Sequence, residues 1–256
     1  DVDFRVESNG NTHMLFVDAG NDRVGINTSS PSTSFHVNGS GDQYITVTSS
    51  NTQGTGIQFG NNTDPDAGRI RYATGDNSLR FTTNNNEALR IDSSGRLLVG
   101  TTTEGAANAD NLTIADSGHA GITVRSGTSS KGAVYFSDGT SGAAEFQGVV
   151  EYDHSSNALV LFSNAAEGLR VDSSQRVGIG TTSPGSFDNS GNQLVISNSS
   201  HAGITIDATS STSCNIHFAD GTTGDESYRG AIQYHHNGDS MRFYTTATER
   251  ARIEWR

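Results

Sequence analysis

The sequence predicts an all-β fold that is built from repeats of short strands. Three observations lead to this prediction. A pattern of about 80 residues recurs along the chain, apolar and polar residues alternate with a period of two inside it, and clusters of turn-forming residues separate the alternating segments. Each strand is therefore expected to be short and to present one apolar face.

The repeat is clearest in two strings, ALRIDSSGRLLVGTT at 88–102 and GLRVDSSQRVGIGTT at 168–182. Further along the chain, an offset of 82 residues relates Leu112 to Leu194. These alignments divide the chain into a partial N-terminal repeat at 1–34, a first repeat at 35–111, a second at 112–193, and a third at 194–256 that is truncated at its C-terminus.

Alternation of apolar and polar residues marks the strands of each repeat. Turn-forming clusters such as GNNTDPDAG separate these strands, and no segment longer than one turn has the apolar spacing of a helix. Each repeat should hold about six to eight strands. In the first repeat they are expected to include ITV at 45–47, GIQFG at 56–60, RIRY at 69–72, LRF at 79–81 and LRI at 89–91.

The composition leaves a single copy of the chain short of core material. Leu, Ile, Val and Phe make up 50 of the 256 residues, and the net charge is −12. We therefore expect other copies of the chain to supply the missing contacts, in a parallel homotrimer of β-prism or β-helix-like segments with small β knobs. The abundant Gly, Ser and Thr would let three backbones approach closely. The predicted axial layers are Phe59/Phe136/Phe218, Leu79/Leu159/Met241 and Leu89/Leu169/Ala251.

Charge and hydropathy exclude several classes of partner. The 28 acidic residues outnumber the 16 basic ones, so a nucleic-acid partner is not expected. Cys214 is the single cysteine of the sequence, which excludes a disulfide within the chain. No apolar run of about 18 residues occurs, so no membrane insertion is expected. The opening DVDFRVESNG lacks the features of a signal peptide, which favours release by cell lysis.

Two segments, residues 3–31 and QRVGIGTTSPGSF at 175–187, resemble repeats in the tail fibres of marine bacteriophages. The family pattern E-x-x-R-I-D-S-S-G-x-V-G-I-G-T-x-x-P is matched within Glu87–Gly95 and again within Glu167–Pro184, and the resemblance covers essentially the whole chain. It implies a structural, homotrimeric fibre that extends from the virion and contacts other virion proteins. It also implies attachment to a host-surface glycan or outer-membrane receptor.

The sequence departs from this pattern at its C-terminal end, where Glu254-Trp255-Arg256 replaces Asp-Ser-Ser. In the family, such breaks often precede an intramolecular chaperone that directs trimerisation and is then cleaved off. Two explanations stay open for this chain. Either the chaperone was cleaved off, or the chain is truncated.

Glycine and histidine motifs favour structural roles. VGIGTTSPG and GTGIQFG contain G-x-G, but neither opens a helix as a phosphate-binding loop requires, so tight turns are expected. On a threefold axis, copies of one histidine could bind a transition metal. His235 and His236 cannot both face such an axis, because adjacent residues of a strand point to opposite faces. No metal site is predicted for the histidines, which include His119, His154, His201, His235 and His236.

Acidic loop residues are the other candidates for chemistry. A glycosidase needs two carboxylates held across a sugar cleft, whereas these acids lie in variable turns. Calcium could bind the Asp64-Pro65-Asp66 loop, and no G-x-S-x-G nucleophile elbow occurs. The loop acids are Asp64, Asp66, Asp138, Asp220, Asp225 and Glu226. The glycosylation sequons, expected by chance in a chain rich in Ser and Thr, begin at Asn27, Asn61, Asn111 and Asn198.

One Glu–Arg pair recurs in all three repeats, with the arginine three residues after the glutamate. The pair could bridge neighbouring chains and fix their register, or it could belong to a solvated strand face. The pairs are Glu87 with Arg90, Glu167 with Arg170, and Glu249 with Arg252.

These observations predict a protein that is not an enzyme, with no catalytic residue, cofactor or metal, and they assign no binding residue. The expected function is extension of a virion fibre and attachment to the host surface. Two alternatives stay open. One is a bacterial surface adhesin or matrix protein, which would carry a signal or an anchor in its complete gene. The other is a polysaccharide-degrading tailspike with a long uninterrupted β-helix.

Overall fold

The structure is a computed structural model, and it describes residues 2–254. The fold is all-β, as predicted. Within these residues the strands form four sheets, each of them open, and three short 3-10 helices accompany them. The sheets belong to two units, of which the first ends at Ile122 and the second begins at Thr123. Each sheet is described by itself.

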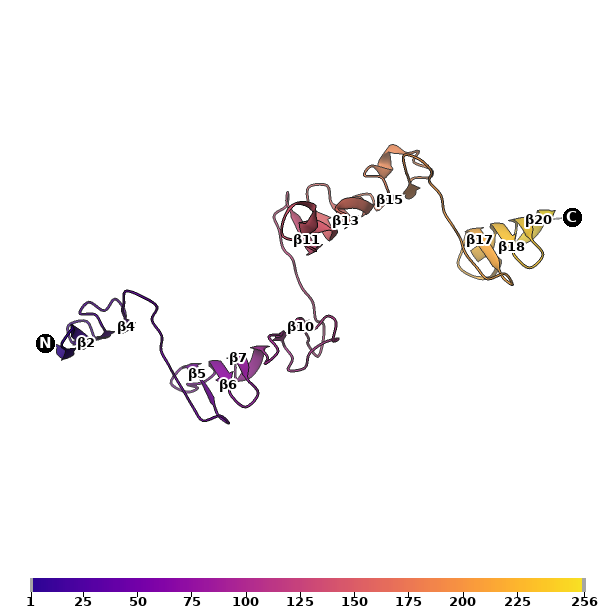
Figure 1. The fold of residues 1–256 in the computed structure, drawn as a ribbon. Helices are drawn as coiled ribbons and strands as arrows, with labels where there is room; N and C mark the ends of the chain where they lie inside the picture. The colour runs from indigo at the N-terminus through magenta and orange to yellow at the C-terminus, as the bar shows by residue number, and fades with distance from the viewer. Residues whose placement is uncertain (1, 255–256) are drawn as a thin grey trace. The chain divides into compact units, whose positions relative to one another are not determined.

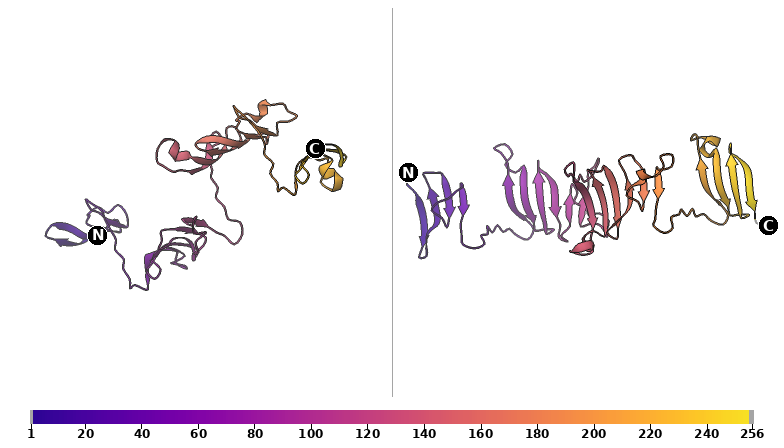
Figure 2. Two further views of the ribbon diagram at one scale, coloured as in Figure 1. Left: turned by 45° about the vertical axis from the view of Figure 1, so that its right-hand side comes forward. Right: turned by 90° about the horizontal axis from the view of Figure 1, so that it is seen from above.

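The first unit holds two sheets whose strands follow chain order (Figures 1 and 2). Neighbouring strands are antiparallel, except that the last strand of each sheet lies parallel to the one before it. One sheet consists of β1 (Phe4–Ser8), β2 (Asn11–Asp18), β3 (Arg23–Ile26) and β4 (Phe35–Val37). The other consists of β5 (Gly54–Phe59), β6 (Gly68–Ala73), β7 (Ser78–Thr83), β8 (Asn86–Ile91), β9 (Leu97–Val99) and β10 (Leu112–Ile114).

The second unit holds a six-stranded sheet of the same plan and a four-stranded sheet that is antiparallel throughout. Its first sheet consists of β11 (Lys131–Phe136), β12 (Gly148–Asp153), β13 (Ala158–Ser163), β14 (Ala166–Val171), β15 (Val177–Ile179) and β16 (Leu194–Ile196), and β16 is again parallel to β15. Its second sheet consists of β17 (Ser213–Phe218), β18 (Gly230–His235), β19 (Ser240–Thr245) and β20 (Thr248–Glu254). The 3-10 helices are η1 (Gly142–Phe146), η2 (Pro184–Ser186) and η3 (Gly224–Tyr228).

Four of the five strands predicted in the first repeat are present as β5 to β8. The fifth prediction was wrong, because the ITV segment at 45–47 has no strand partner and joins two sheets. The matching segments GITV at 121–124 and GITI at 203–206 are also unpaired. The first strand of each repeat (β4, β10 or β16) is the last strand of the preceding sheet. The unpaired connecting segment follows it, and the next sheet begins after that segment.

Two-residue turns join the last long hairpin of three sheets. A turn of this kind needs a positive φ at both central residues, because only then does its twist match that of the flanking strands. Of the residues other than glycine, asparagine is among those that adopt this conformation most readily. The central pairs are Asn84 (φ 48°) and Asn85 (61°), Asn164 (54°) and Ala165 (56°), and Thr246 (51°) and Ala247 (54°).

The small core lies on one face of each sheet. In the sheet from β11 to β16, Val149 and Val160 are 4% and 3% exposed, and Val195 is also buried. The crossover between β15 and β16 contains the buried Pro184 and Asn192. The opposite face of each sheet has no such cover, and it carries most of the large apolar side chains.

Candidate functional site: the exposed apolar faces

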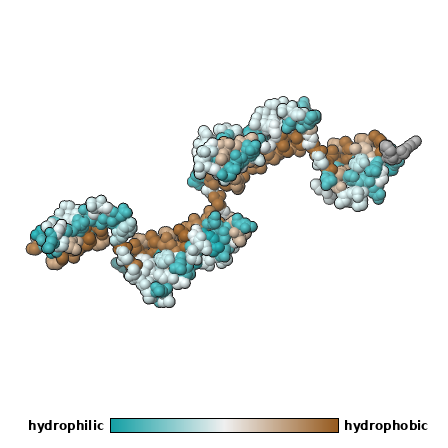
Figure 3. All heavy atoms as spheres, viewed as in Figure 1, coloured by the Kyte–Doolittle hydropathy of each residue, from teal (hydrophilic) through white to brown (hydrophobic). Residues whose placement is uncertain are grey.

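The uncovered face of each sheet carries apolar side chains in rows that run across the strands, and we call it the apolar face. The strand register sets these rows, because it places residues of like chemistry opposite one another. In Figure 3 brown apolar atoms gather along one side of each part of the chain. The central rows are Ile57, Ile70, Phe81, Leu89, Val99 and Ile114 in β5–β10; Val134, Val150, Leu161, Leu169, Ile179 and Ile196 in β11–β16; and Ile216, Ile232, Phe243 and Ala251 in β17–β20.

The side chains of the apolar faces are unusually exposed for their size. Phe59, Phe136 and Phe218 are 53%, 59% and 58% exposed, and each ends the first strand of its sheet opposite a glycine. These three residues thus occupy equivalent positions in their own sheets. Contiguous apolar surface of this extent is typical of protein–protein contact sites.

An apolar groove adjoins two of the three parallel edge strands, β10 and β16. In the first unit the groove has a volume of about 400 Å³ and lies between β10, at Leu112 and Ile114, and the returning segment at Ala120–Ile122. An equivalent groove of about 410 Å³ lies between β16 and the segment at Ala202–Ile204. The groove is therefore part of the repeat.

A β-bulge keeps the apolar side chains on one face past each hairpin turn. One extra residue separates the paired positions in β8, β14 and β20, and that residue is Ala88, Gly168 or Arg250. Residues three apart in a regular strand face opposite sides, but the bulge places them on the same side. This explains why the recurring glutamate and arginine can meet.

The recurring Glu–Arg pair forms within one strand. Nη2 of Arg170 donates to Oε2 of Glu167 at 2.7 Å, and Nε of Arg170 donates to Oε1 of the same carboxylate at 2.6 Å. The hydrogen bond that the arginine donates to its glutamate raises the pKa of Arg90 and likewise that of Arg170. The Nε and Nη2 donors of the arginine are thus used inside the chain, so the pair forms without a contribution from a neighbouring chain. The pair holds the bulge.

The Asp-Ser-Ser-Gly motif forms a turn. Oδ1 of Asp92 accepts hydrogen bonds from the backbone N–H groups of Ser94 (2.9 Å) and Arg96 (3.0 Å). The bond from the Arg96 backbone is the main reason that the pKa of Asp92 lies below its ordinary value. Asp172 makes the same two bonds in the next repeat, to Ser174 and Arg176. The motif that carries the family resemblance is therefore structural.

The histidines pack against aromatic and polar neighbours. The ring of His154 meets Tyr152 edge-on, with ring centres 4.9 Å apart, and His236 meets Tyr234 in the same way at 5.0 Å. Nε2 of His236 lies 3.4 Å from Sγ of Cys214. His119 and His201 lie in connecting segments. In residues 2–254 no three His, Cys, Asp or Glu side chains lie close enough together to hold a metal ion.

The loop acids lie in three connections between strands, and several of them have a polar or basic partner. Asp64 accepts a hydrogen bond from Asn85 at 2.9 Å. Asp225, in η3, accepts one from the hydroxyl of Tyr228 at 3.0 Å. Asp66 lies 3.5 Å from Arg69, and Asp220 lies 3.3 Å from Arg229. Asp138 follows β11, and Glu226 is in η3.

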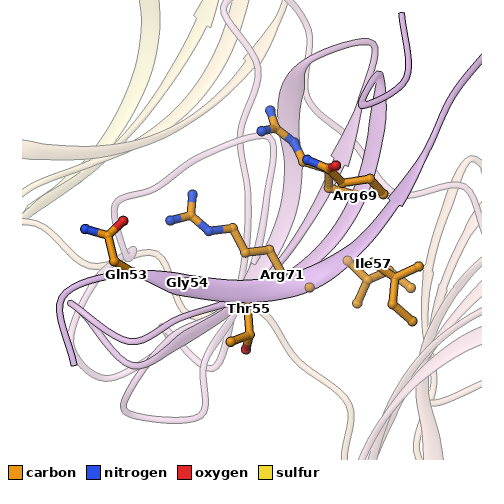
Figure 4. Close-up of a pocket in the computed structure, with 9 residues that line it drawn as sticks. Gln53, Gly54, Thr55, Ile57, Arg69 and Arg71 are labelled. Atoms are coloured by element: carbon orange, nitrogen blue, oxygen red, sulfur yellow. The ribbon is translucent and has the colours of Figure 1, made fainter. Parts of the chain in front are cut away.

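Sequence reasoning did not predict one hollow, which lies beside β5 and has a volume of about 360 Å³ (Figure 4). Its lining includes Arg69 and Arg71, from the RIRY string, and the glycines of GTGIQFG. Both strings were visible in the sequence, but their pairing across adjacent strands, which forms the hollow, was not.

Comparison with known proteins identifies no relative, since no protein-family model and no curated protein matches the chain. None of the helices in the described part of the chain is long and apolar enough to cross a membrane. Trp255, where the repeat pattern breaks, lies outside the described residues.

Proposed function

We propose that this chain is a structural segment of a homotrimeric bacteriophage fibre that extends from the virion and attaches to the host surface. The observation that carries the proposal is the exposed apolar face, which recurs in every sheet with its rows in register. A surface of this kind is costly to leave in water. A partner that covers the apolar face of every sheet must have apolar rows at the same spacing along its length. Another copy of the chain has this spacing because its sequence is identical.

A threefold arrangement accounts for these faces without leaving one uncovered. Three open sheets can turn their apolar faces towards a common axis and form a β-prism, whose side chains meet in layers. Phe59, Phe136 and Phe218 would each contribute one layer of three rings. A twofold arrangement would also bury an apolar face, so the resemblance to phage tail fibres supports the number three.

The connecting segments support the same proposal. Ile45, Ile122 and Ile204 are 72%, 70% and 68% exposed, and their segments alternate apolar and polar residues without any strand partner. In a trimer these segments can cover the neighbouring grooves or pair with their own copies. Either contact would bury them.

Two measurements test the proposal. Sedimentation equilibrium should give three times the chain mass of 26.9 kDa. Negative-stain images of phage particles labelled with an antibody to this chain should show the label on a fibre. A stable monomer in solution would overturn the trimer, and labelling of bacterial cells in place of virions would favour a surface adhesin.

The fibre is also proposed to lack enzymatic activity. Its loop acids lie in the turns between β5 and β6, between β11 and β12, and between β17 and β18, and several of them bind a basic or polar side chain, whereas glycoside hydrolysis needs two acids held across a sugar cleft. Incubation with host capsule or lipopolysaccharide should release no oligosaccharide. Release that disappears on replacing one loop aspartate would favour a tailspike.

A further inference from the structure

The hollow lies beside the edge strand β5, and the polar side chains that line it lie on the face opposite the apolar face, while Ile57 and Ile70 of the apolar face border it. Figure 4 shows Gln53, Arg69 and Arg71 projecting to one side of β5, while Thr55 projects to the other. Gln58 completes the polar lining, and Gln53, Gln58 and Arg71 are exposed. The polar side of the hollow therefore stays open to solvent when the apolar face is covered.

Arg71 has a free guanidinium. Within residues 2–254 it makes no ion pair and no side-chain hydrogen bond that would neutralise its charge. Its side chain lies over β5 because glycine faces it there, and a Cβ atom added at Gly54 would lie 2.2 Å from Nε of Arg71. Arg69, two residues earlier on the same face of β6, lies 3.5 Å from Asp66 and is 30% exposed.

In the second repeat an ion pair occupies the position equivalent to the hollow. The register puts Lys131 and Glu151 where the first repeat has Gly54 and Arg71. Nζ of Lys131 lies 2.8 Å from Oε1 of Glu151, whose side chain is only 6% exposed. The repeat fold therefore does not need an open arginine at this place, and the presence of Arg71 in the first repeat calls for another explanation.

The chemistry of the hollow fits one class of ligand. A guanidinium binds a carboxylate through two parallel hydrogen bonds. The amides of Gln53 and Gln58 can donate to and accept from hydroxyl groups, and β5 is an edge strand with unpaired backbone groups. The volume of about 360 Å³ lies within the range of small-ligand sites.

We propose that this hollow binds a carboxylate-bearing sugar of an acidic surface glycan, with the carboxylate on Arg71 and the hydroxyls on the two glutamines. Its use as a receptor contact rests on the proposed fibre function, whereas binding of the sugar does not. The net charge of −12 opposes non-specific attraction of polyanions, so an acidic sugar would have to be held by a local group such as Arg71.

Binding can be tested on the full chain with galacturonate, its methyl ester, galactose and inorganic sulfate as probes, by NMR titration or calorimetry. Galacturonate should bind most tightly. Arg71→Ala should weaken its binding at least about tenfold, since a charge-assisted hydrogen bond contributes about 1.5–3 kcal/mol. Arg125→Ala removes an exposed arginine elsewhere and should leave binding unchanged. The double variant Gly54→Lys with Arg71→Glu copies the pair of the second repeat, and it should abolish binding while keeping the fold.

Three results would overturn the proposal: equal binding of the ester or of sulfate, equal loss in the Arg71 and Arg125 variants, or binding that persists in the double variant. A trimer that binds no galacturonate would refute this site and leave the fibre proposal standing. A monomer that binds it through Arg71 would refute the fibre proposal and leave the site standing.

Discussion

Replacing Phe136 by aspartate tests whether the apolar faces assemble. Phe136 ends β11 on the apolar face, and the chain itself leaves it 59% exposed. Tyr135 supplies a matched control. It precedes Phe136 on the same strand, points to the opposite face and is 57% exposed. The two substitutions therefore place the same charge at nearly the same height, one inside the proposed trimer and one outside it.

The expected size of the effect follows from the exposed area of the ring. A phenylalanine side chain of roughly 200 Å² that is 59% exposed leaves roughly 120 Å² to bury, equivalent to about 3 kcal/mol per chain at about 25 cal/mol per Å². Three chains contribute about 9 kcal/mol to one layer, which corresponds to more than about six powers of ten in the trimer dissociation constant. Three carboxylates near the axis would add a desolvation cost.

Sedimentation equilibrium at micromolar concentration is the appropriate assay. The unmodified chain and Tyr135→Asp should sediment as trimers, whereas Phe136→Asp should sediment as a monomer or aggregate. A Phe136→Asp trimer as tight as that of the unmodified chain would show that this face does not lie at the interface. Equal disruption by both substitutions would show that the effect comes from misfolding of the sheet.

Three further predictions concern the repeat, a turn and an acid. Deleting residues 112–193 should leave a shorter assembled protein, because β16 can then pair with β9 as β10 does; aggregation alone would show that the repeats depend on one another. Ala247→Gly should stabilise the chain towards urea by about 1 kcal/mol, since φ at this residue is 54°, whereas Ala158→Gly in β13 should destabilise it. The hydrogen bond from Ser155 is the main reason that the pKa of Asp153 is lowered from 3.8 to about 2, so its carboxylate contributes stability that is present above pH 3.8 and lost as the pH falls towards 2. Asp153→Asn should flatten the dependence of Tm on pH in that window, and an unchanged slope would contradict this reasoning.

The bulges show what sequence reasoning could predict about the recurring Glu–Arg pair and what it could not. The spacing of Glu167 and Arg170 was visible in the sequence, and so was its recurrence. A regular strand would put these residues on opposite faces, which made an interchain contact a reasonable hypothesis. The extra residue Gly168 reverses one side chain, and the pair closes within its own strand.

The sequence by itself determined the all-β fold, most of the strands and the apolar alternation, because each of these depends on neighbours within a few residues. It also showed the repeat, which follows from aligning the sequence with itself. Only the tertiary structure decided which strands share a sheet, and so where each apolar row runs. It also left Ile45-Thr46-Val47 unpaired, since a strand needs a partner that the local pattern cannot supply. The arginine hollow was decided in the same way: Gly54 and Arg71 are 17 residues apart in the chain, and only the register of β5 with β6 brings the guanidinium over the glycine.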